Sequence, residues 1–427
     1  MKDDVIRYKE FCQFKSEIRA SKEHLVVGMD IAKDKHYAFF GTARGKTLFR
    51  RFIFNNNIKG YMRLIEQTEE LQTQYDLPEA VFGFEPTGNY HKPLAEWLIN
   101  NEHFLMFVSG KAVHDNREML TGRWDKNDDT DSANVADLIS QGKCLFYENP
   151  EESIIELRNL LSLRKRLKKE DHSLRMRIRN GLLAKYFPEM DQHWRSAIGE
   201  NLAIVKYCID PKKISEMDFM EFVKQVTTMD RGERQLVRLR KIYDAASKSI
   251  GLPVDSSVEF EARMLVDRLK SVRERINDTM HQIEKVGRKH KSYKLLQTIP
   301  GFGPFISALV LSAIGNPFRF RSYKQVIRLS GYDLNASRSG KTSKSAVPVI
   351  SKKGNSDLRY GLYQASKIST YHNPQFRQLF NRVLKDRERE RGIKTKMRVK
   401  IAAKLLVIAW TLMKKGEPFN PDMLITE

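Results

Sequence analysis

The sequence predicts an α/β domain over residues 1–150, followed by a chain that is mostly α-helical. Short apolar runs typical of strands alternate with helical spacing in the first 150 residues, whereas apolar residues beyond them recur at steps of three and four. The charge changes at the same place. Residues 1–150 hold 20 Lys+Arg and 23 Asp+Glu, and the remainder holds 55 Lys+Arg and 30 Asp+Glu. We therefore expect one nearly neutral domain and a strongly basic helical region.

The order of elements in the first 150 residues defines the expected sheet. We predict strands at Leu25–Ile31, His36–Gly41, Thr47–Phe54, Ala80–Phe84 and Phe104–Val108, and helices at Lys59–Tyr75 and Lys92–Asn100. Three meandering strands followed by helix, strand, helix and strand is the order of an RNase H-like (RuvC-like) α/β layer. In that layer the first strand is central, the fourth strand ends beside it, and a final helix covers the same sheet edge.

Four acidic residues occupy these three places. Asp30 closes the first strand, Glu85 closes the fourth, and Asp128 and Asp131 lie three apart at the start of a helical pattern. Each carboxylate alone is most simply a turn or cap residue. Together, carboxylates at adjacent strand ends and on one helix face are suited to hold two hard divalent cations. Such cations are used by enzymes that cut or join phosphodiesters.

Residues 151–290 are predicted to form a basic coiled coil with a helical insertion at about 190–255. One long amphipathic helix is expected from residue 151 to about 188, and a second apolar stripe with nearly heptad spacing runs over 265–286. The two stripes are expected to pair as an antiparallel coiled coil or to associate between subunits. Between them, shorter helical pieces are broken by proline and glycine.

Residues 291–427 are predicted to form a mostly helical C-terminal domain that begins with a helix–hairpin–helix. The segment Leu295–Phe305 contains a Pro-Gly-x-Gly hairpin between two helical patterns, the second of which starts at Pro304. Gly301 and Gly303 would let the backbone approach a phosphate, which the free N–H groups of the second helix would bind. The alternative is a tight corner between two helices that binds no ligand.

The composition restricts the class of protein. With 427 residues, 41% hydrophobic and 30% charged, the chain is expected to fold into several domains. Its three cysteines have no CxxC spacing, which argues against a zinc knuckle or a disulfide framework and fits a reducing cytosol. No apolar run is long enough to span a bilayer, and the charged start lacks the apolar segment of a signal peptide. The basic region indicates nucleic-acid binding, although solvated basic helices are the simpler alternative.

Motifs at both ends of the chain resemble those of the DEDD transposases, the insertion-sequence recombinases that include the Piv-type DNA invertases. The matching motifs are Gly28-Met-Asp-Ile-Ala-Lys33, Glu85-Pro-Thr-Gly-Asn-Tyr90, Lys126-Asn-Asp128 with Asp131, Pro300-Gly-Phe-Gly-Pro304, Arg338-Ser-Gly-Lys341 and Ile350-Ser-Lys-Lys-Gly-Asn355. The chain departs from the family pattern at Asn127, where threonine is usual, and at Pro348-Val349, where a glycine usually precedes Ile-Ser-Lys. Neither departure removes a proposed catalytic group.

The resemblance implies an activity and a set of partners. It makes Asp30, Glu85, Asp128 and Asp131 a RuvC-like site for two Mg²⁺ ions, with Mn²⁺ as a substitute, and Ser339 the nucleophile. It implies a homo-oligomer, a dimer or a tetramer, in which the acidic site of one subunit faces the serine domain of another. Donor and target DNA would be the substrates, a noncoding bridge RNA the guide, and the nucleoid of a bacterial or archaeal cytoplasm the location.

Basic residues near the serine and the hairpin are expected to contact nucleic acid. The expected contacts are Gly301, Gly303, Arg338, Lys341, Lys352 and Lys353. Arg338 and Lys341 flank Ser339 and would neutralise charge on the reacting phosphate. From the residues alone, nearby hydroxyl groups compete for the role of nucleophile: Ser337, Thr342, Ser343 and Ser345.

Two other interpretations stay open on the residues alone. A metal-dependent nuclease, such as a Holliday-junction resolvase, would need the four acids but not Ser339, because water would be its nucleophile. A non-enzymatic basic coiled-coil protein that binds RNA or DNA would show no metal-dependent strand chemistry. A covalent protein–DNA product that depends on Ser339 would separate recombination from both.

Overall fold

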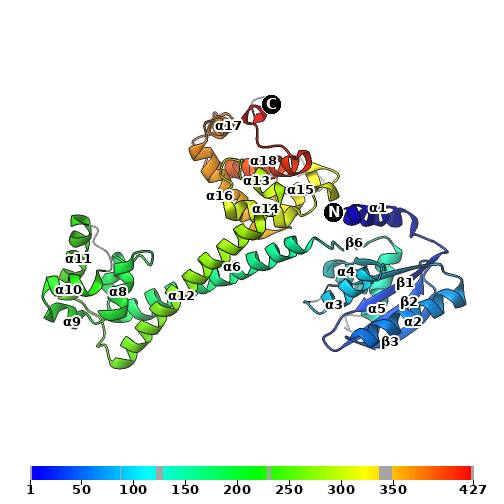
Figure 1. Cartoon of the computed structure of the whole chain (residues 1–427), viewed down its shortest axis with the longest axis horizontal. Helices are drawn as coiled ribbons and strands as arrows, with labels where there is room; N and C mark the ends of the chain where they lie inside the picture. Colours follow the sequence, from blue (N-terminus) through cyan, green and yellow to red (C-terminus); the bar gives the residue numbers. More distant parts are fainter. Residues whose placement is uncertain (1, 87, 122–127, 228–231, 336–348, 425–427) are drawn as a thin grey trace, which may run out of the picture. The chain divides into compact units, whose positions relative to one another are not determined.

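The computed structural model describes residues 2–86, 88–121, 128–227, 232–335 and 349–424 of the chain. The chain folds as two compact units, residues 1–151 and residues 152–427 (Figure 1). The first unit is a mixed α/β structure and the second is mostly helical, as the sequence predicts. Within the described ranges, every helix is too short or too polar to cross a membrane.

A six-stranded mixed sheet forms the centre of the first unit. Its strands are β1 (His24–Asp30), β2 (Lys35–Thr42), β3 (Thr47–Asn55), β4 (Glu79–Phe84), β5 (Phe104–Phe107) and β6 (Leu145–Phe146). The strand order is β3-β2-β1-β4-β5-β6, and β1 pairs antiparallel with β2 and parallel with β4. The predicted RNase H-like order is confirmed for the first five strands. Strand β6 pairs antiparallel with β5 and is not among the predicted elements.

Helices cover both faces of this sheet. They are α1 (Lys2–Glu17), α2 (Ile58–Tyr75), α3 (His91–Asn100), α4 (Gly110–Thr121) and α5 (Asp128–Ser140). Side chains alternate along β1, so Val27 and Met29 pack in one core with α2 and α3. Val26 packs on the opposite face with residues from α1, α4 and α5. Helix α4 is not among the predicted elements.

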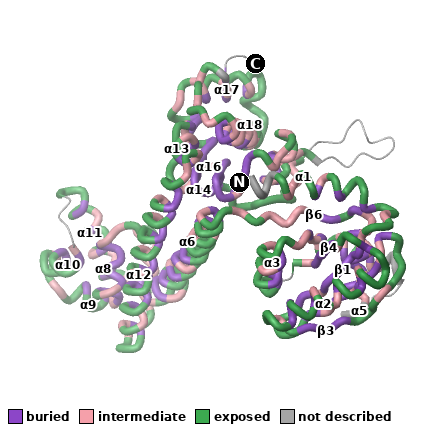
Figure 2. Tube along the Cα trace, turned by 45° about the vertical axis from the view of Figure 1, so that its right-hand side comes forward, coloured by how far each residue is buried: buried purple, intermediate pink, exposed green. Residues whose placement is uncertain are grey.

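Two long helices, α6 (Glu152–Met176) and α12 (Ser256–Gly287), pack side by side in the second unit. They run antiparallel, because each end of α6 shares a core with the opposite end of α12. These pairs are Ile154 and Leu157 with Ile283 and Val286, and Leu167 and Leu174 with Leu265 and Leu269. Exposed residues follow the outer sides of both helices (Figure 2). The apolar stripes therefore form the seam between the two helices, and the polar residues face solvent.

The helical path of α6 continues to Tyr186 but changes its winding, a change that the apolar spacing does not predict. Residues Arg177–Leu183 form a π-helix, and α7 (Ala184–Tyr186) completes the path before Pro188. A π-helix turns less per residue than an α-helix, so the apolar stripe moves around the helix axis. Ile178 and Leu182 thereby join the core of the following insertion.

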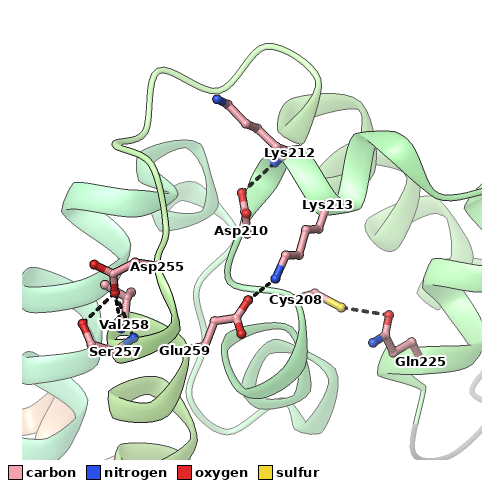
Figure 3. Close-up of polar contacts among 9 residues, drawn as sticks. All are labelled: Cys208, Asp210, Lys212, Lys213, Gln225, Asp255, Ser257, Val258 and Glu259. Carbon is pink, nitrogen blue, oxygen red and sulfur yellow. Dashed lines mark hydrogen bonds and ion pairs between the residues drawn. The ribbon is translucent and has the colours of Figure 1, made fainter.

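The insertion between α6 and α12 consists of short helices. They are a 3₁₀ turn (Pro188–Gln192), α8 (Gly199–Tyr207), α9 (Pro211–Glu216), α10 (Phe219–Val226) and α11 (Glu233–Ala246). Polar contacts tie these helices to one another and to α12 (Figure 3). Lys213 of α9 forms an ion pair with Glu259 of α12, and Cys208 Sγ donates to Gln225 Oε1 at 3.3 Å. Asp255 caps α12 by accepting from the backbone N–H of Ser257 at 2.9 Å.

The C-terminal part of the second unit packs around one central helix. Its elements are α13 (Lys291–Leu296), α14 (Pro304–Ile314), a 3₁₀ turn (Pro317–Arg319), α15 (Tyr323–Ser330), β7 (Leu334–Asn335), β8 (Val349–Ile350), α16 (Ser356–His372), α17 (Pro374–Leu384), α18 (Ile393–Lys415) and a 3₁₀ turn (Pro421–Leu424). Helix α18 buries Ile401, Leu405 and Ala409 in a core that also contains residues of α14 and α16. Trp410 Nε1 donates to the carbonyl of Pro317 at 2.8 Å, which fixes the turn after α14 against α18.

Candidate active site

Asp30 and Glu85 end neighbouring parallel strands and lie on the same face of the sheet. Met29 pairs with Phe84 in the register of β1 and β4, so the residues that follow them are neighbours at the sheet edge. Met29 and Phe84 point into the core shared with α2 and α3. Because side chains alternate along a strand, Asp30 and Glu85 point to the opposite face, which α5 covers.

Two glycines let α5 lie directly on β1 and β4. Gly28 and Gly83 face each other in the parallel register. A Cβ atom on Gly28 would lie 2.3 Å from the carbonyl oxygen of Ser132 and 2.5 Å from the backbone nitrogen of Ala136. A Cβ atom on Gly83 would lie 2.4 Å from Ile139 Cδ1. The backbone of α5 therefore touches β1, and this contact holds the start of the helix over the sheet.

Asp131 lies near the start of α5 in a buried ion pair. Its side chain is 8% exposed, and Arg117 Nη2 of α4 donates to its Oδ1 at 2.5 Å. The arginine compensates a carboxylate that is otherwise withdrawn from water, where an unpaired charge is costly. Asp128 is the first residue of the same helix, and its side chain lies outside the described part of the chain.

A buried network of side-chain hydrogen bonds joins α4 to α5. Asn116 Nδ2 donates to Asn134 Oδ1 at 2.7 Å and to Asp137 Oδ2 at 2.8 Å, and Gln141 Nε2 donates to the same carboxylate oxygen at 2.6 Å. Asn134 Nδ2 donates to the carbonyl of Val113 at 2.7 Å. Satisfied buried networks rigidify their surroundings. This network holds the helix segment that carries the arginine of the ion pair.

The start of α4 leaves room for the Glu85 carboxylate. A Cβ atom on Gly110, the first residue of α4, would lie 2.5 Å from Glu85 Oε1. The preceding Ser109 accepts at its Oγ from the backbone N–H of Ala112 at 3.2 Å and so caps the helix. The positive end of a helix dipole favours a nearby carboxylate. Helix α4 thus contacts both Glu85 and Asp131, although the sequence offered no signal for it.

The donor chemistry at this sheet edge fits hard divalent cations. Asp30, Glu85 and Asp131 offer carboxylate oxygens, the ligands that Mg²⁺ prefers, from β1, from the end of β4 and from α5. Asp128 would supply a fourth carboxylate. Among the described side chains, which do not include that of Asp128, no three acidic, histidine or cysteine residues lie close enough together to hold a metal ion.

The predicted hairpin between α13 and α14 has one glycine that the packing requires. Gly301 has a φ of +87°, and a Cβ atom there would lie 2.5 Å from the carbonyl oxygen of Ala365 in α16. The tight corner alone therefore explains Gly301. A Cβ atom on Gly303 would meet open space, so packing does not explain that glycine.

Ser339, Arg338 and Lys341 lie outside the described residues. The flanking segments pair as β7 and β8, with Leu334 opposite Ile350. Lys352 and Lys353 are exposed in the turn between β8 and α16. Ser351 Oγ of the same turn donates to Asp333 Oδ1 at 2.6 Å.

Comparison with known proteins assigns both ends of the chain. A family model described as a transposase of the DEDD, IS110 type matches residues 27–188, and a model described as the transposase IS116/IS110/IS902 family matches residues 293–381. Similar proteins include the pilin gene-inverting protein of Moraxella bovis, 22% identical over 397 residues, which are 92% of this chain and 97% of the relative. The transposase for insertion sequence element IS1111A of Coxiella burnetii is 22% identical over 429 residues, 98% of each chain.

An RNase H-like sheet with acidic residues at its edge, in a chain matched by these families, defines a transposase, an enzyme that processes DNA. The two matched stretches together cover more than half of the chain. The chain belongs to the IS116/IS110/IS902 family of transposases. Membership of the DEDD type implies a divalent metal ion.

Proposed function

We propose that this transposase cuts and rejoins DNA through a covalent serine–DNA intermediate. Ser339 is the proposed nucleophile, and Asp30, Glu85, Asp128 and Asp131 are the proposed ligands of two Mg²⁺ ions. One observation carries the metal site: Asp30 and Glu85 are neighbours at one sheet edge, on the face where α5 is seated against β1. The resemblance of the motif Arg338-Ser-Gly-Lys341 supports the serine.

The protein's own secondary structure fixes the backbone positions from which the proposed ligands extend. Bound metal ions would supply Lewis-acid stabilisation of the negative charge that develops on the reacting phosphate. Asp30 and Glu85 come from the ends of hydrogen-bonded strands, so the spacing of their backbones is fixed. Asp131 is carried by α5 and pairs with Arg117 of α4, a contact that a bound metal ion would have to replace. Such preorganisation is the main structural contribution to catalysis at polar sites.

The proposed covalent step conserves the energy of the phosphodiester. The Oγ of Ser339 forms a bond to phosphorus, the bond from phosphorus to the 3′ oxygen breaks, and the serine proton is lost while the 3′ oxygen gains one. The 5′ phosphate stays attached to the serine as a phosphodiester. A 3′ hydroxyl of another strand reverses the step and joins the DNA without ATP. Arg338 and Lys341 neutralise charge on the five-coordinate phosphate.

The basic second unit is the proposed grip for nucleic acid. Residues 152–427 carry all of the chain's net positive charge, because the first unit holds more acidic than basic residues. Affinity that depends on phosphate contacts falls steeply with salt. We extend the proposal to a noncoding bridge RNA as guide, bound by the basic helices and the insertion. We also extend it to a dimer or tetramer in which the acids of one subunit act with Ser339 of another.

A denaturing gel tests the proposed function. The full chain is mixed with Mg²⁺, the RNA transcribed from the flanks of its own element, and labelled target DNA. The wild type should give a band in which DNA is covalently attached to protein. Ser339→Ala should abolish that band, whereas Ser345→Ala, a matched change in the same segment, should keep it.

The nuclease alternative predicts a different gel. Free cleaved DNA from both the wild type and Ser339→Ala, with no protein-attached band, would assign hydrolysis by water and overturn the serine intermediate. Asp30→Asn should remove strand chemistry under either interpretation. Normal recombination by Asp30→Asn would contradict the metal site itself.

A further inference from the structure

We infer that the outer face of α16 binds single-stranded nucleic acid by stacking unpaired bases on Tyr360 and Tyr371. The inference rests on the proposed nucleic-acid grip of the second unit and specifies where that unit meets bases rather than phosphates. Three observations carry it: exposed aromatic rings on one helix face, a local excess of positive charge, and an arginine guanidinium close over a ring beside this helix.

Helix α16 has one buried flank and one aromatic exposed flank. Leu358, Leu362 and Ala365 are buried in the core of the C-terminal part. On the opposite side, Tyr360 is 65% exposed and Tyr371 is 71% exposed. Positions 360, 364, 367 and 371 follow steps of three and four, so they share one face of the helix. The two rings are three turns apart, about 16 Å along the axis.

Rings this exposed require an explanation outside the core. A tyrosine ring this exposed gains little from the protein's own packing, although the Tyr371 ring meets His372 edge to face with 4.8 Å between the ring centres. Exposed apolar groups on one face can mark a binding surface. Ile368, 48% exposed, borders the same face. Lys367 lies between the two tyrosines, with its Nζ 5.8 Å from the centre of the Tyr363 ring. The face therefore combines flat apolar groups with a cation.

The excess of basic residues around α16 favours binding of a polyanion. Residues 349–384 contain six Lys or Arg and a single acidic residue, Asp357. That carboxylate is already paired, because Lys165 Nζ of α6 lies 2.7 Å from its Oδ2. Lys352 and Lys353 are exposed just before the helix. The positive charge of this surface is therefore left for an external partner, as expected at a nucleic-acid interface.

Arg164 of α6, next to Lys165 in the sequence, adds a second group that can stack on a base. The guanidinium carbon of Arg164 lies 3.8 Å from the centre of the Phe305 ring, at the start of α14. Burial lowers the pKa of Arg164, and its Nε has no hydrogen-bond partner among the described residues. A guanidinium stacked on a ring is oriented in advance and can itself stack on a base. Its sequence neighbour Lys165 bonds to Asp357 in the first turn of α16, which places it beside that helix.

Stacking on aromatic rings is tolerant of sequence and is a common way to bind unpaired DNA or RNA. The α16 face is thus suited to a single strand, whereas an intact duplex hides its base faces.

Binding of labelled oligothymidylate and oligouridylate to the full chain tests the inference. Base stacking on an aromatic side chain corresponds to roughly a 5- to 150-fold change in affinity on truncation. Tyr360→Ala and Tyr371→Ala should each weaken binding of at least one of the two oligonucleotides by that factor, and which one weakens identifies the strand type. Tyr360→Phe and Tyr371→Phe should bind as the wild type does. Tyr323 of α15 is also exposed, at 50%, so Tyr323→Ala is the control and should bind normally.

A blunt DNA duplex and light scattering complete the experiment. Equal loss of duplex and single-strand binding in the alanine variants would overturn stacking, as would unchanged single-strand binding. A changed oligomeric state with unchanged oligonucleotide affinity would make this face a contact between protein copies instead. Ser339→Ala should bind both oligonucleotides normally, so loss of the covalent product would not be mistaken for failure of this surface.

Discussion

Replacing Gly28 with alanine tests whether the seat of α5 on β1 sets the geometry of the acidic site. The new Cβ atom would lie 2.3 Å from the carbonyl oxygen of Ser132 and 2.8 Å from the Cβ of Ala136. Carbon and oxygen atoms in ordinary contact stay about 3.3 Å or more apart. Both obstacles belong to or adjoin the helix backbone, so they cannot rotate away. Helix α5 must move by about 1 Å to accept the methyl group.

The displacement has two measurable consequences. Overpacking of this kind costs about 1–3 kcal/mol of the free energy of unfolding. Because α5 also carries Asp128 and Asp131, its movement shifts them relative to Asp30, and a misplacement of about 1 Å costs on the order of 10²-fold in rate. Urea unfolding measures the first effect. The initial rate of covalent DNA product formation measures the second.

Gly83→Ala is the matched control, because it adds the same methyl group under the same helix. The obstacle at Gly83 is Cδ1 of Ile139, the flexible end of a side chain, which can change rotamer. We expect Gly83→Ala to retain most of the activity and to lose less stability than Gly28→Ala. A Gly28→Ala protein with wild-type stability and wild-type rate would refute the argument that backbone contact positions α5. Equal effects of the two substitutions would refute the distinction between backbone and side-chain obstacles.

Three further predictions use other parts of the chain. Arg117→Gln should lower the free energy of unfolding by about 3 kcal/mol, because it removes the partner of the buried Asp131 carboxylate. Added Mg²⁺ should raise the melting temperature of this variant more than that of the wild type, because Arg117 no longer competes with the metal ion for Asp131. An unchanged response would contradict this competition. Burial raises the pKa of Asp171, but hydrogen bonds and charges from Arg175 and Arg273 outweigh burial and leave this pKa below its usual value. The ionised Asp171 therefore stabilises the fold above about pH 4, and this stabilisation is lost as the pH falls through the lowered pKa. Asp171→Asn should therefore destabilise at pH 7 by about 1–3 kcal/mol, whereas Asp191→Asn, which removes a more exposed pair, should cost less than about 1 kcal/mol in the same urea titration. Burial raises the pKa of Cys208 to about 12, so at pH 8 its thiol should react with a thiol reagent only after unfolding; rapid labelling of the native protein would contradict its burial.

The strand ends that carry acids could be predicted from local pattern. A strand buried on both faces reads as a continuous apolar run, and β1 and β4 are both of this kind. The first polar residue after each run is then a residue of the sheet edge, which identifies Asp30 and Glu85. The parallel pairing of the two strands follows from the RNase H-like order of elements, in which two strands and a helix separate β1 from β4 in the sequence. Local periodicity and simple connection rules were sufficient for this half of the site.

The partner of Asp131 could not be predicted in the same way. Among the described side chains of α4, those buried are Val113 and Asn116, so the segment has no apolar stripe to indicate a helix. Arg117 meets Asp131 across 14 residues of sequence, through a contact that only the packing of α4 on α5 creates. The donors and acceptors of a buried polar network pair through contacts between residues distant in sequence, so the network produces no periodic sequence pattern.

Pro211 and Gly232 of the insertion, predicted to break helices, lie where helices begin. Pro211 occupies the first turn of α9, where its missing N–H costs nothing. Gly232 has a φ of +75° and precedes α11. Each residue therefore starts a helix. The π-helical winding at Arg177–Leu183 gave no sequence signal, because it depends on the insertion's core pulling the apolar stripe around the axis.

Helix α12 is a rigid connection between the two cores of the second unit. It runs for 32 residues without interruption, about 48 Å at the rise of an α-helix, and its two ends are embedded in different cores. A flexible tether between those cores would let each one move alone. A continuous helix instead converts any tilt at the insertion into a proportional swing at the other end, where α13 and α14 follow. A partner that binds and tilts the insertion would therefore also change the orientation of α13 and α14, which precede Ser339 in the chain.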